Sequence, residues 1–243
     1  MGRERLSVEV LSYTDGIERL IAKSAKLCYS NSNISELSED LNVTEIKEFI
    51  DKLLSMGHES PIEHIKITFG IEGVSRVLTH QLVRHRISSF SQQSQRYVRF
   101  EDDLSYIIPD RIMNDEKARE KYINHMDKCF DLYLELTADL MNSGYGEKKA
   151  IEEARYVLPN ASASKIIVTM NGRSLFNFFR LRSCNRAQKE IRDLSDRMLK
   201  LSREISPVLF NNAGPSCVTE GKCSEGKYFC GTFRKGLMVD NYE

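Results

Sequence analysis

One long segment, residues 115–143, limits the possible folds more than any other part of the chain. Its apolar side chains recur at intervals of three or four residues, which places them along one face of an α-helix. Gly144 follows as a helix stop signal. We interpret the aromatic and methionine side chains of this stripe as core residues. The stripe consists of Tyr122, Met126, Cys129 or Phe130, Tyr133, Leu136 or Thr137, and Leu140.

Other segments have the pattern of β-strands. Residues 65–71 alternate cleanly, with isoleucine or phenylalanine at every second position, which is typical of a half-buried strand. Gly73 is expected to end that strand. Residues 7–13 and 164–170 also favour strands, and residues 97–100 are a further strand candidate.

Shorter helices are predicted along the rest of the chain. For the last of them, Asn185 is the expected N-cap, with Gln188 three residues later as in a capping box. No internal repeat or linker precedes about residue 207. The sequence therefore predicts one mixed domain, residues 1–207, and a loosely attached tail rich in Cys, Gly and Lys, residues 208–243. The predicted helices cover residues 15–28, 43–56, 74–83, 148–157, 171–182 and 185–205, and a polar break at residues 30–39 separates the first two.

The composition excludes some classes of protein. Lysine plus arginine and aspartate plus glutamate are equal at 35 each in a chain of 243 residues, so the net charge is zero. A dedicated nucleic-acid binder is usually basic overall, and the local positive charge therefore favours a small anionic ligand. No segment has the apolar run of a signal peptide or a membrane span. We expect a soluble cytoplasmic protein with free thiols and no membrane partner.

The stretch Arg84–Tyr97 is unusually rich in hydrogen-bond donors. Three arginines, one histidine, three glutamines and four serines fall within its fourteen residues, and it contains no acid, glycine or proline. Arginine binds phosphate or carboxylate as a rigid fork, and hydroxyls and amides complete the shell around an anion. The stretch therefore predicts a phosphate- or nucleotide-binding element.

A second basic cluster, residues 171–186, has the spacing of a helix with two different sides. Arg173, Asn177 and, less closely, Arg180 share one face, while leucine and phenylalanine side chains lie between them. A solvated amphipathic helix is the alternative interpretation. Because two donor-rich stretches occur in a chain of zero net charge, we favour one composite site to which both contribute.

Two smaller features could also carry chemistry. The segment 58–64 holds two histidines and two glutamates, but Pro61 would break the helix that a His-Glu-x-x-His metal motif needs. A turn that offers contacts to a ligand is therefore favoured there. Ser94 has no evident general base close to it in the sequence, and we interpret it as a binding residue rather than a nucleophile.

Three tail cysteines, Cys217, Cys223 and Cys230, invite a metal interpretation. Their intervals differ from the Cys-x-x-Cys pairs of ordinary zinc sites, and a fourth ligand is not evident. The alternative is a mobile tail with incidental thiols, so no metal is assigned. Gly-x-Gly-x-x-Gly and Walker sequences are missing, which excludes a dinucleotide held in the Rossmann or P-loop manner.

Taken together, these motifs resemble the flavin-dependent thymidylate synthases. The signature of that family is Arg-His-Arg, seven residues, and then Ser-x-Arg, which matches Arg84-His85-Arg86 and Ser94-Gln95-Arg96. The match covers most of residues 25–205. Its further blocks, in the right order, are residues 58–64, 153–159, 171–182 and 187–191.

The resemblance implies an α+β fold with a mainly antiparallel sheet flanked by long helices, assembled as a homotetramer with FAD where subunits meet. It also implies methylene transfer from methylenetetrahydrofolate to C5 of dUMP, with a hydride from NADPH passing through the flavin, to give dTMP. Arg182 matches the catalytic arginine placed against the uracil. The flavin site would comprise His58, Ser60, Glu63, Arg84, His85, Arg86, Ile87, Asn171, Arg173 and Asn177, and the dUMP site Gln81, Arg84, Gln92, Ser94, Gln95, Arg96, Arg155 and Arg182.

Two other functions are open as alternatives. A flavin- or nucleotide-binding oxidoreductase with another substrate would share the cofactor but would not convert dUMP. An RNA-binding protein that uses the arginine stretch is disfavoured by the neutral composition. The chain departs from many relatives at Ser91 and Gln92 and from some at Arg186, and the resemblance leaves the contacts of these residues open.

Overall fold

The computed structural model describes residues 4–37, 42–100 and 104–237. The end of the predicted polar break, residues 38–39, and the end of the predicted tail, residues 238–243, lie outside the described residues. The chain divides into two compact units. The first unit consists of residues 1–7, 71–83 and 90–167, and the second of residues 8–70, 84–89 and 168–243.

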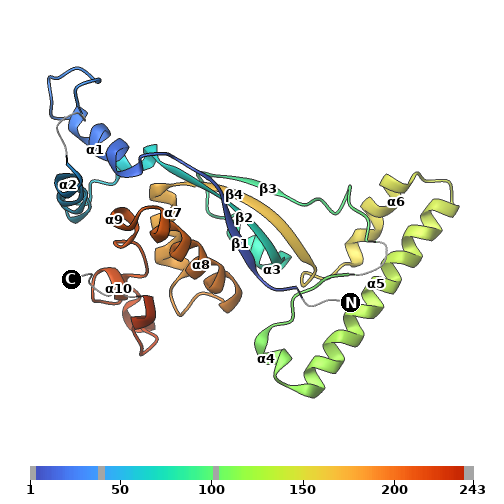
Figure 1. Ribbon diagram of the computed structural model, residues 1–243. Coiled ribbons are helices and arrows are strands. Elements are labelled where there is room, and N and C mark those ends of the chain that lie inside the picture. The colour runs from blue at the N-terminus through green and yellow to red at the C-terminus, as the bar shows by residue number, and fades with distance from the viewer. Residues whose placement is uncertain (1–3, 38–41, 101–103, 238–243) are drawn as a thin grey trace. The chain divides into compact units, whose positions relative to one another are not determined.

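Four strands form one sheet (Figure 1). β2 and β4 run antiparallel, because the Gly172 N–H donates to Ile65 O and the hydroxyl oxygens of Thr68 and Thr169 are 2.9 Å apart. Helices accompany this antiparallel pairing, so the chain has the α+β fold that the resemblance implies. The strands are β1 (Ser7–Tyr13), β2 (Lys66–Ser75), β3 (Ser88–Gln92) and β4 (Ala163–Asn171), in the order β1-β2-β4-β3.

Strand β2 confirms the alternating pattern and corrects its end. Ile67 and Phe69 are fully buried, as the pattern predicts. Gly73 does not end the strand, which continues to Ser75, so that prediction is wrong. At Gly73 φ is +66°, and a Cβ would lie 2.1 Å from Arg5 O. Glycine is needed there because a neighbouring backbone approaches closely, and not because the strand stops.

In the first unit, α5 (Glu116–Asn142) is the long helix that the apolar stripe predicts (Figure 1). Asp115 caps it by accepting the Ala118 N–H. The two alternatives within the stripe are decided in favour of Phe130 and Thr137, which are buried. Neither α5 nor any other described helix is both long and apolar enough to cross a membrane. The other helices of this unit are α3 (Arg76–Leu82), α4 (Asp110–Met113), α6 (Glu147–Ala154) and the 3₁₀ turn η2 (Arg155–Val157).

The second unit contains the two helices that follow β4. α7 (Gly172–Arg182) begins after its N-cap Asn171, and α8 (Lys189–Ile205) begins after Gln188. Asn185 is therefore not the N-cap of α8, because the chain from Cys184 to Ala187 forms a turn instead. The other helices of this unit are α1 (Ile17–Leu27), α2 (Val43–Ser55), α9 (Pro207–Phe210), α10 (Ser216–Thr219) and the 3₁₀ turns η1 (Ser60–His64), η3 (Gly226–Tyr228) and η4 (Lys235–Leu237).

Two predictions based on weak patterns are wrong. Residues 97–100 are not a strand, because the amides of Tyr97 and Val98 close a turn on Ser94 O. The tail is not loosely attached in its first part, since Leu209 and Phe210 are fully buried. These two side chains belong to α9, which places them in the core of the second unit.

Candidate functional site

Helix α7 presents hydrogen-bond donors on one side and core residues on the other. Asn171 starts the helix, with its Oδ1 accepting the Ser174 N–H at 2.8 Å. Phe178 and Phe179 are fully buried, which fixes the rotation of the helix about its axis. The predicted two-sided helix is therefore confirmed. Its exposed residues include Arg173, Asn177 and Arg180.

Arg182, at the end of α7, is held by His85. Its Nε donates to His85 Nε2 at 2.9 Å, and the imidazole packs edge-on against Phe178 with ring centroids 5.0 Å apart. Burial, and to a lesser degree the charge of Arg182, lowers the pKa of His85 to about 4. The ring is therefore neutral near pH 7, accepting at Nε2 with its hydrogen on Nδ1. Because the contact uses Nε, it does not engage the two Nη groups of Arg182, which can donate to a ligand.

The neighbours of His85 form an exposed turn. Arg84 and Arg86 are exposed on either side of the buried imidazole. Ile87 is 80% exposed and has φ = 61°, a left-handed conformation that is strained for a β-branched residue. Ser174 Oγ donates to Ile87 O at 3.1 Å, which ties the turn to α7. Backbone strain of this kind concentrates at binding sites, where surrounding contacts hold it.

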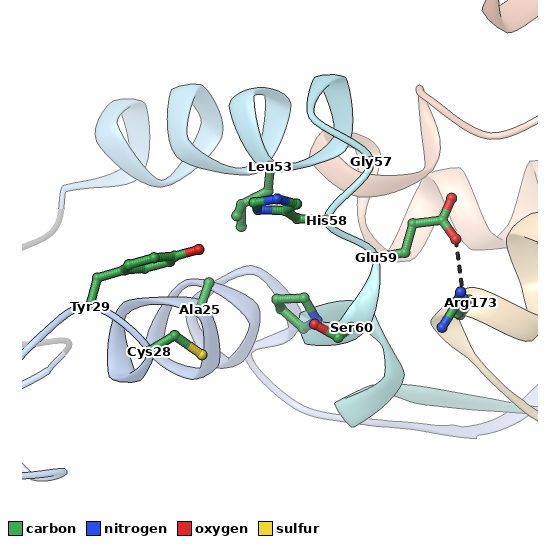
Figure 2. A pocket seen from close by; sticks show the side chains of 10 residues that line it. Ala25, Cys28, Tyr29, Leu53, Gly57, His58, Glu59, Ser60 and Arg173 are labelled. Atoms are coloured by element: carbon green, nitrogen blue, oxygen red, sulfur yellow. Dashed lines mark ion pairs between the residues drawn. The ribbon is translucent and has the colours of Figure 1, made fainter.

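A cavity of about 380 Å³ lies beside the start of α7 (Figure 2). Its lining includes three predicted site residues, His58, Ser60 and Arg173. Cys28 and Tyr29, which follow α1, line it as well and were missed by the sequence analysis. Figure 2 shows His58 and Tyr29 reaching the cavity from different elements. A cavity of this size, with aromatic and polar walls, is typical of a site for an organic ligand.

Arg173 stands at the edge of this cavity between two carboxylates. Its Nη1 is 2.6 Å from Glu63 Oε1. Its Nε is 3.2 Å from Glu59 Oε2, the ion pair that Figure 2 marks. The hydrogen bond and charge of Glu63 raise the pKa of Arg173. The structure thus brings two predicted site residues, Arg173 and Glu63, into direct contact. The guanidinium is fixed in orientation before any ligand arrives.

In the first unit, the second half of the arginine stretch forms a polar cluster of its own. Gln92 Nε2 donates to Thr79 Oγ1 at 3.1 Å and to Ser164 Oγ at 3.0 Å, so these contacts set the side chain and leave its amide oxygen as an acceptor. Ser94 Oγ accepts the Arg96 N–H at 3.1 Å. Gln95 Nε2 is buried and has no hydrogen-bond partner among the described residues. An unsatisfied buried donor at this position fits a ligand acceptor.

Three arginines of the first unit could contribute positive charge to this cluster. They are Arg96, which follows Ser94 in the sequence, Arg155, and Arg76, which is close enough to Arg155 to feel its charge. Arg96 is 2.5 Å from Glu152, and Arg155 Nε donates to the backbone oxygen of the same Glu152 at 3.2 Å. Arg76 is a residue that the sequence analysis missed. Its Nη1 is buried without a hydrogen-bond partner among the described residues, and burial and the charge of Arg155 lower its pKa. Neighbouring arginines of this kind favour an anion.

The predicted site residues fall into two groups. All residues assigned to the flavin belong to the second unit. The residues assigned to dUMP belong to the first unit, with two exceptions, Arg84 and Arg182, which belong to the second. Gln81, the remaining dUMP residue, lies on α3 in the first unit. Within the segment 58–64, which we expected to be a turn, Ser60–His64 form the 3₁₀ turn η1. The joining of both groups in one composite site stays a prediction.

Comparison with known proteins bears on the family of the chain. Residues 9–208 match the family described as "Thymidylate synthase complementing protein". The chain is 49% identical over 234 residues to a flavin-dependent thymidylate synthase of Clostridium tetani, covering 93% of each chain. It is 46% identical over 227 residues to that of Geobacter sulfurreducens, covering 93% of this chain and 94% of the other.

A solved structure is also similar. The UMP/dUMP methylase PolB from Streptomyces cacaoi, bound with 5-Br dUMP, has a TM-score of 0.70 and covers 86% of this chain and 94% of its own. The sequence identity is 22%, so this similarity concerns the fold alone. It agrees with the α+β arrangement of helices around an antiparallel sheet.

Proposed function

Because the chain belongs to the family of flavin-dependent thymidylate synthases, we propose that it converts dUMP to dTMP with methylenetetrahydrofolate as carbon donor and NADPH as reductant. The observation that carries the proposal is the contact between Arg182 and His85. It fixes a cation at the motif position that the family places against the uracil. The reaction needs such a cation, since negative charge develops on the pyrimidine.

The donor set of the second unit fits FAD. Exposed Arg84 and Arg86 can pair with a pyrophosphate, while Glu63 can accept from ribose hydroxyls. FAD, when bound, supplies the hydride relay between NADPH and the transferred carbon. In the proposed site, His85 Nε2 is occupied by Arg182, so the imidazole also orients that guanidinium. The residues that would hold the cofactor are His58, Ser60, Glu63, Arg84, His85, Arg86, Ile87, Asn171, Arg173 and Asn177.

The donor set of the first unit fits the nucleotide. Arg96 and Arg155 would hold the phosphate, and the buried Nε2 of Gln95 would gain its missing acceptor. The amide oxygen of Gln92 would accept from a sugar or base N–H or O–H group. Arg76 is an additional candidate, because its Nη1 lacks a partner in the described part of the chain. The residues that would bind dUMP are Gln81, Arg84, Gln92, Ser94, Gln95, Arg96, Arg155 and Arg182.

Within this site, Arg182 stabilises the negative charge on the pyrimidine, and His85 orients the guanidinium of Arg182. The guanidinium is always protonated, so it acts as a fixed cation and not as an acid. A neutral imidazole accepts the Nε–H without adding a competing positive charge. Both Nη groups then face the ligand with little orientational freedom left to lose. Ser94 serves as a binding group, consistent with its contact to the Arg96 amide.

We further propose a cytoplasmic homotetramer with active sites at subunit interfaces, as the family resemblance implies. Residues 1–207 would form the catalytic domain, with residues 208–243 as a C-terminal extension of it. Sedimentation velocity of the purified chain tests the assembly. A monomer in the presence of FAD would contradict it.

Anaerobic turnover tests the function. Purified protein loaded with FAD is mixed with dUMP, methylenetetrahydrofolate and NADPH, and the products are separated by chromatography. Formation of dTMP that depends on all three substrates is the expected result. Oxidation of NADPH without dTMP would favour the alternative of an oxidoreductase acting on another substrate.

A further inference from the structure

Four cysteines from two distant parts of the chain line one small cavity of the second unit. Cys217 lies in α10, and Cys223 and Cys230 lie on either side of η3. These three have no evident fourth partner in the sequence. The structure supplies one in Cys184, which lies just after α7. All four are free thiols.

The size of this cavity restricts its occupant. Its volume is about 20 Å³, whereas a single water molecule needs roughly 10–15 Å³ measured in the same way. The space therefore suits one atom and excludes a nucleotide or any other organic ligand. Sulfur ligands select soft cations, and zinc is bound by four cysteines in tetrahedral sites.

A hydrogen bond to one of the sulfurs is already in place. Asn185 Nδ2 donates to Cys230 Sγ at 3.7 Å. Groups that surround a metal site orient its ligands in this manner.

The charges around the cavity favour a negative cluster. Arg180 and Arg234 both line it, and four thiolates around a zinc ion carry a net negative charge. Arg234 is anchored by Asp196 at 2.7 Å and by Ser183 O at 2.9 Å. The carboxylate nearby, Glu225, is paired with Arg186 at 2.7 Å and is thereby neutralised.

We propose that Cys184, Cys217, Cys223 and Cys230 form a tetrathiolate site for one zinc ion. The ion joins the loops between residues 217 and 230 to the end of α7. Cys184 lies two positions after Arg182, so the same ion would steady the helix end that carries this arginine. The proposal concerns a structural site and does not depend on the proposed reaction.

The thiols must turn inward to bind the ion. As they stand, the described residues contain no group of three or more His, Cys, Asp or Glu side chains that could hold a metal ion. Cys230 shows the reason, since its Sγ donates to Thr232 O at 3.0 Å. Rotation about one side-chain torsion moves a cysteine sulfur between staggered positions while the backbone stays in place. Deprotonation on metal binding removes the thiol hydrogen that Thr232 O accepts.

Metal analysis of the full chain is the first test. Protein purified under reducing conditions and passed over a chelating resin should contain about one zinc per chain. Cys184→Ser and Cys223→Ser should lose most of it. Cys129→Ser is the matched control, because Cys129 lies on α5 outside this cavity, and its zinc content should equal that of the wild type.

Cobalt substitution of the wild type keeps the test decisive if a variant fails to fold. Cobalt bound by four thiolates gives intense sulfur-to-metal charge-transfer absorption together with the visible bands of a tetrahedral ion. Reduced wild-type protein that carries no zinc and gives no such absorption would overturn the proposal. Intact mass spectrometry that finds these four cysteines joined as disulfides in the freshly purified protein would overturn it as well.

Discussion

Arg182 Nε lies 2.9 Å from His85 Nε2, although 97 positions separate the two residues in the sequence. The imidazole is neutral and 8% exposed, so it directs the guanidinium without sharing its charge. The pairing also explains why the Arg84-His85-Arg86 motif combines two arginines with a histidine. Two exposed arginines flank a histidine that faces inward, towards Phe178 and Arg182.

Replacing Arg182 with alanine should lower kcat by about 10²–10³-fold, because one fixed electrostatic contact to developing charge is lost. Much of the flavin should remain bound, since most of the proposed cofactor residues are untouched. Turnover and the visible absorbance of the purified variant measure the two effects. A variant with full activity would show that the role given to Arg182 is wrong.

Acid should destabilise the protein through His85. Burial, followed by the charge of Arg182, lowers its pKa to about 4, below the unfolded value of about 6.5. The unfolded chain therefore takes up a proton first, and the free energy of unfolding should fall as pH decreases from about 6.5 to about 4, by up to about 3 kcal/mol. Above about pH 6.5, the full contribution of the neutral His85 to the free energy of unfolding is present.

Urea unfolding at several pH values measures this loss. His85→Gln is the control, because glutamine keeps an acceptor for Arg182 and does not titrate. Its free energy of unfolding should depend less on pH within the window. Equal dependence in both proteins would assign the acid sensitivity to other groups.

Glu152→Gln should strengthen dUMP binding. The carboxylate lies 2.5 Å from Arg96 and competes with a phosphate for it. An exposed ion pair of this kind contributes about 0.2–1 kcal/mol, so KM for dUMP should fall by about 1.5- to 5-fold. Glu147→Gln is the matched control, because Glu147 pairs with Arg99, which has no assigned role, at 2.9 Å. A similar fall in KM in the control would point to overall charge as the cause.

Ile87→Gly should relieve backbone strain. The left-handed conformation of Ile87 costs about 1–3 kcal/mol for a β-branched residue and little for glycine. Its side chain is 80% exposed, so little packing is lost. Ser89→Gly, in β3, is the control, because no strain is released there. Chemical unfolding should find the Ile87 variant more stable than the control by about 1–3 kcal/mol. No difference would mean that the turn is not strained in solution.

Gly172→Ala should destabilise the second unit. A Cβ at this position would lie 2.4 Å from Ile62 O, and the obstacle is backbone. Overpacking of this kind costs about 1–3 kcal/mol, which thermal unfolding would detect. Gly146→Ala, before α6, has no atom within 4 Å of the added Cβ and should be neutral or slightly stabilising. Equal melting temperatures for the two variants would contradict the close approach.

Strong periodic patterns predicted the fold where one face of an element is buried. The stripe of α5 and the alternation of β2 are examples, because burial selects apolar residues at the helical or strand period. Strand β3 was missed for the opposite reason. Its residues, Ser88–Gln92, are mostly polar and none is fully buried, so backbone pairing forms the strand without a hydrophobic signal.

Motif matching named some residues that the structure brings into contact, such as Glu63 and Arg173, but it could not predict the contacts themselves. The bond between His85 and Arg182 depends on packing across the fold, and Arg76 carries no local signal at all. The same holds for Cys184, which lies 33 or more positions from the cysteines of the tail. Side chains that meet through tertiary structure leave no spacing pattern in the sequence.

The cap of α7 determines which atoms of a ligand can lie beside Asn171. Because Oδ1 is held by the Ser174 amide, only the NH₂ half of the amide is left to face outwards. A ligand atom at this position must therefore offer a lone pair, as a carbonyl, a ring nitrogen or a phosphate oxygen does. The start of α7 therefore favours ligand acceptors over ligand donors. For a bound ring with donors on one edge and acceptors on the other, the acceptor edge would face the Asn171 NH₂ group.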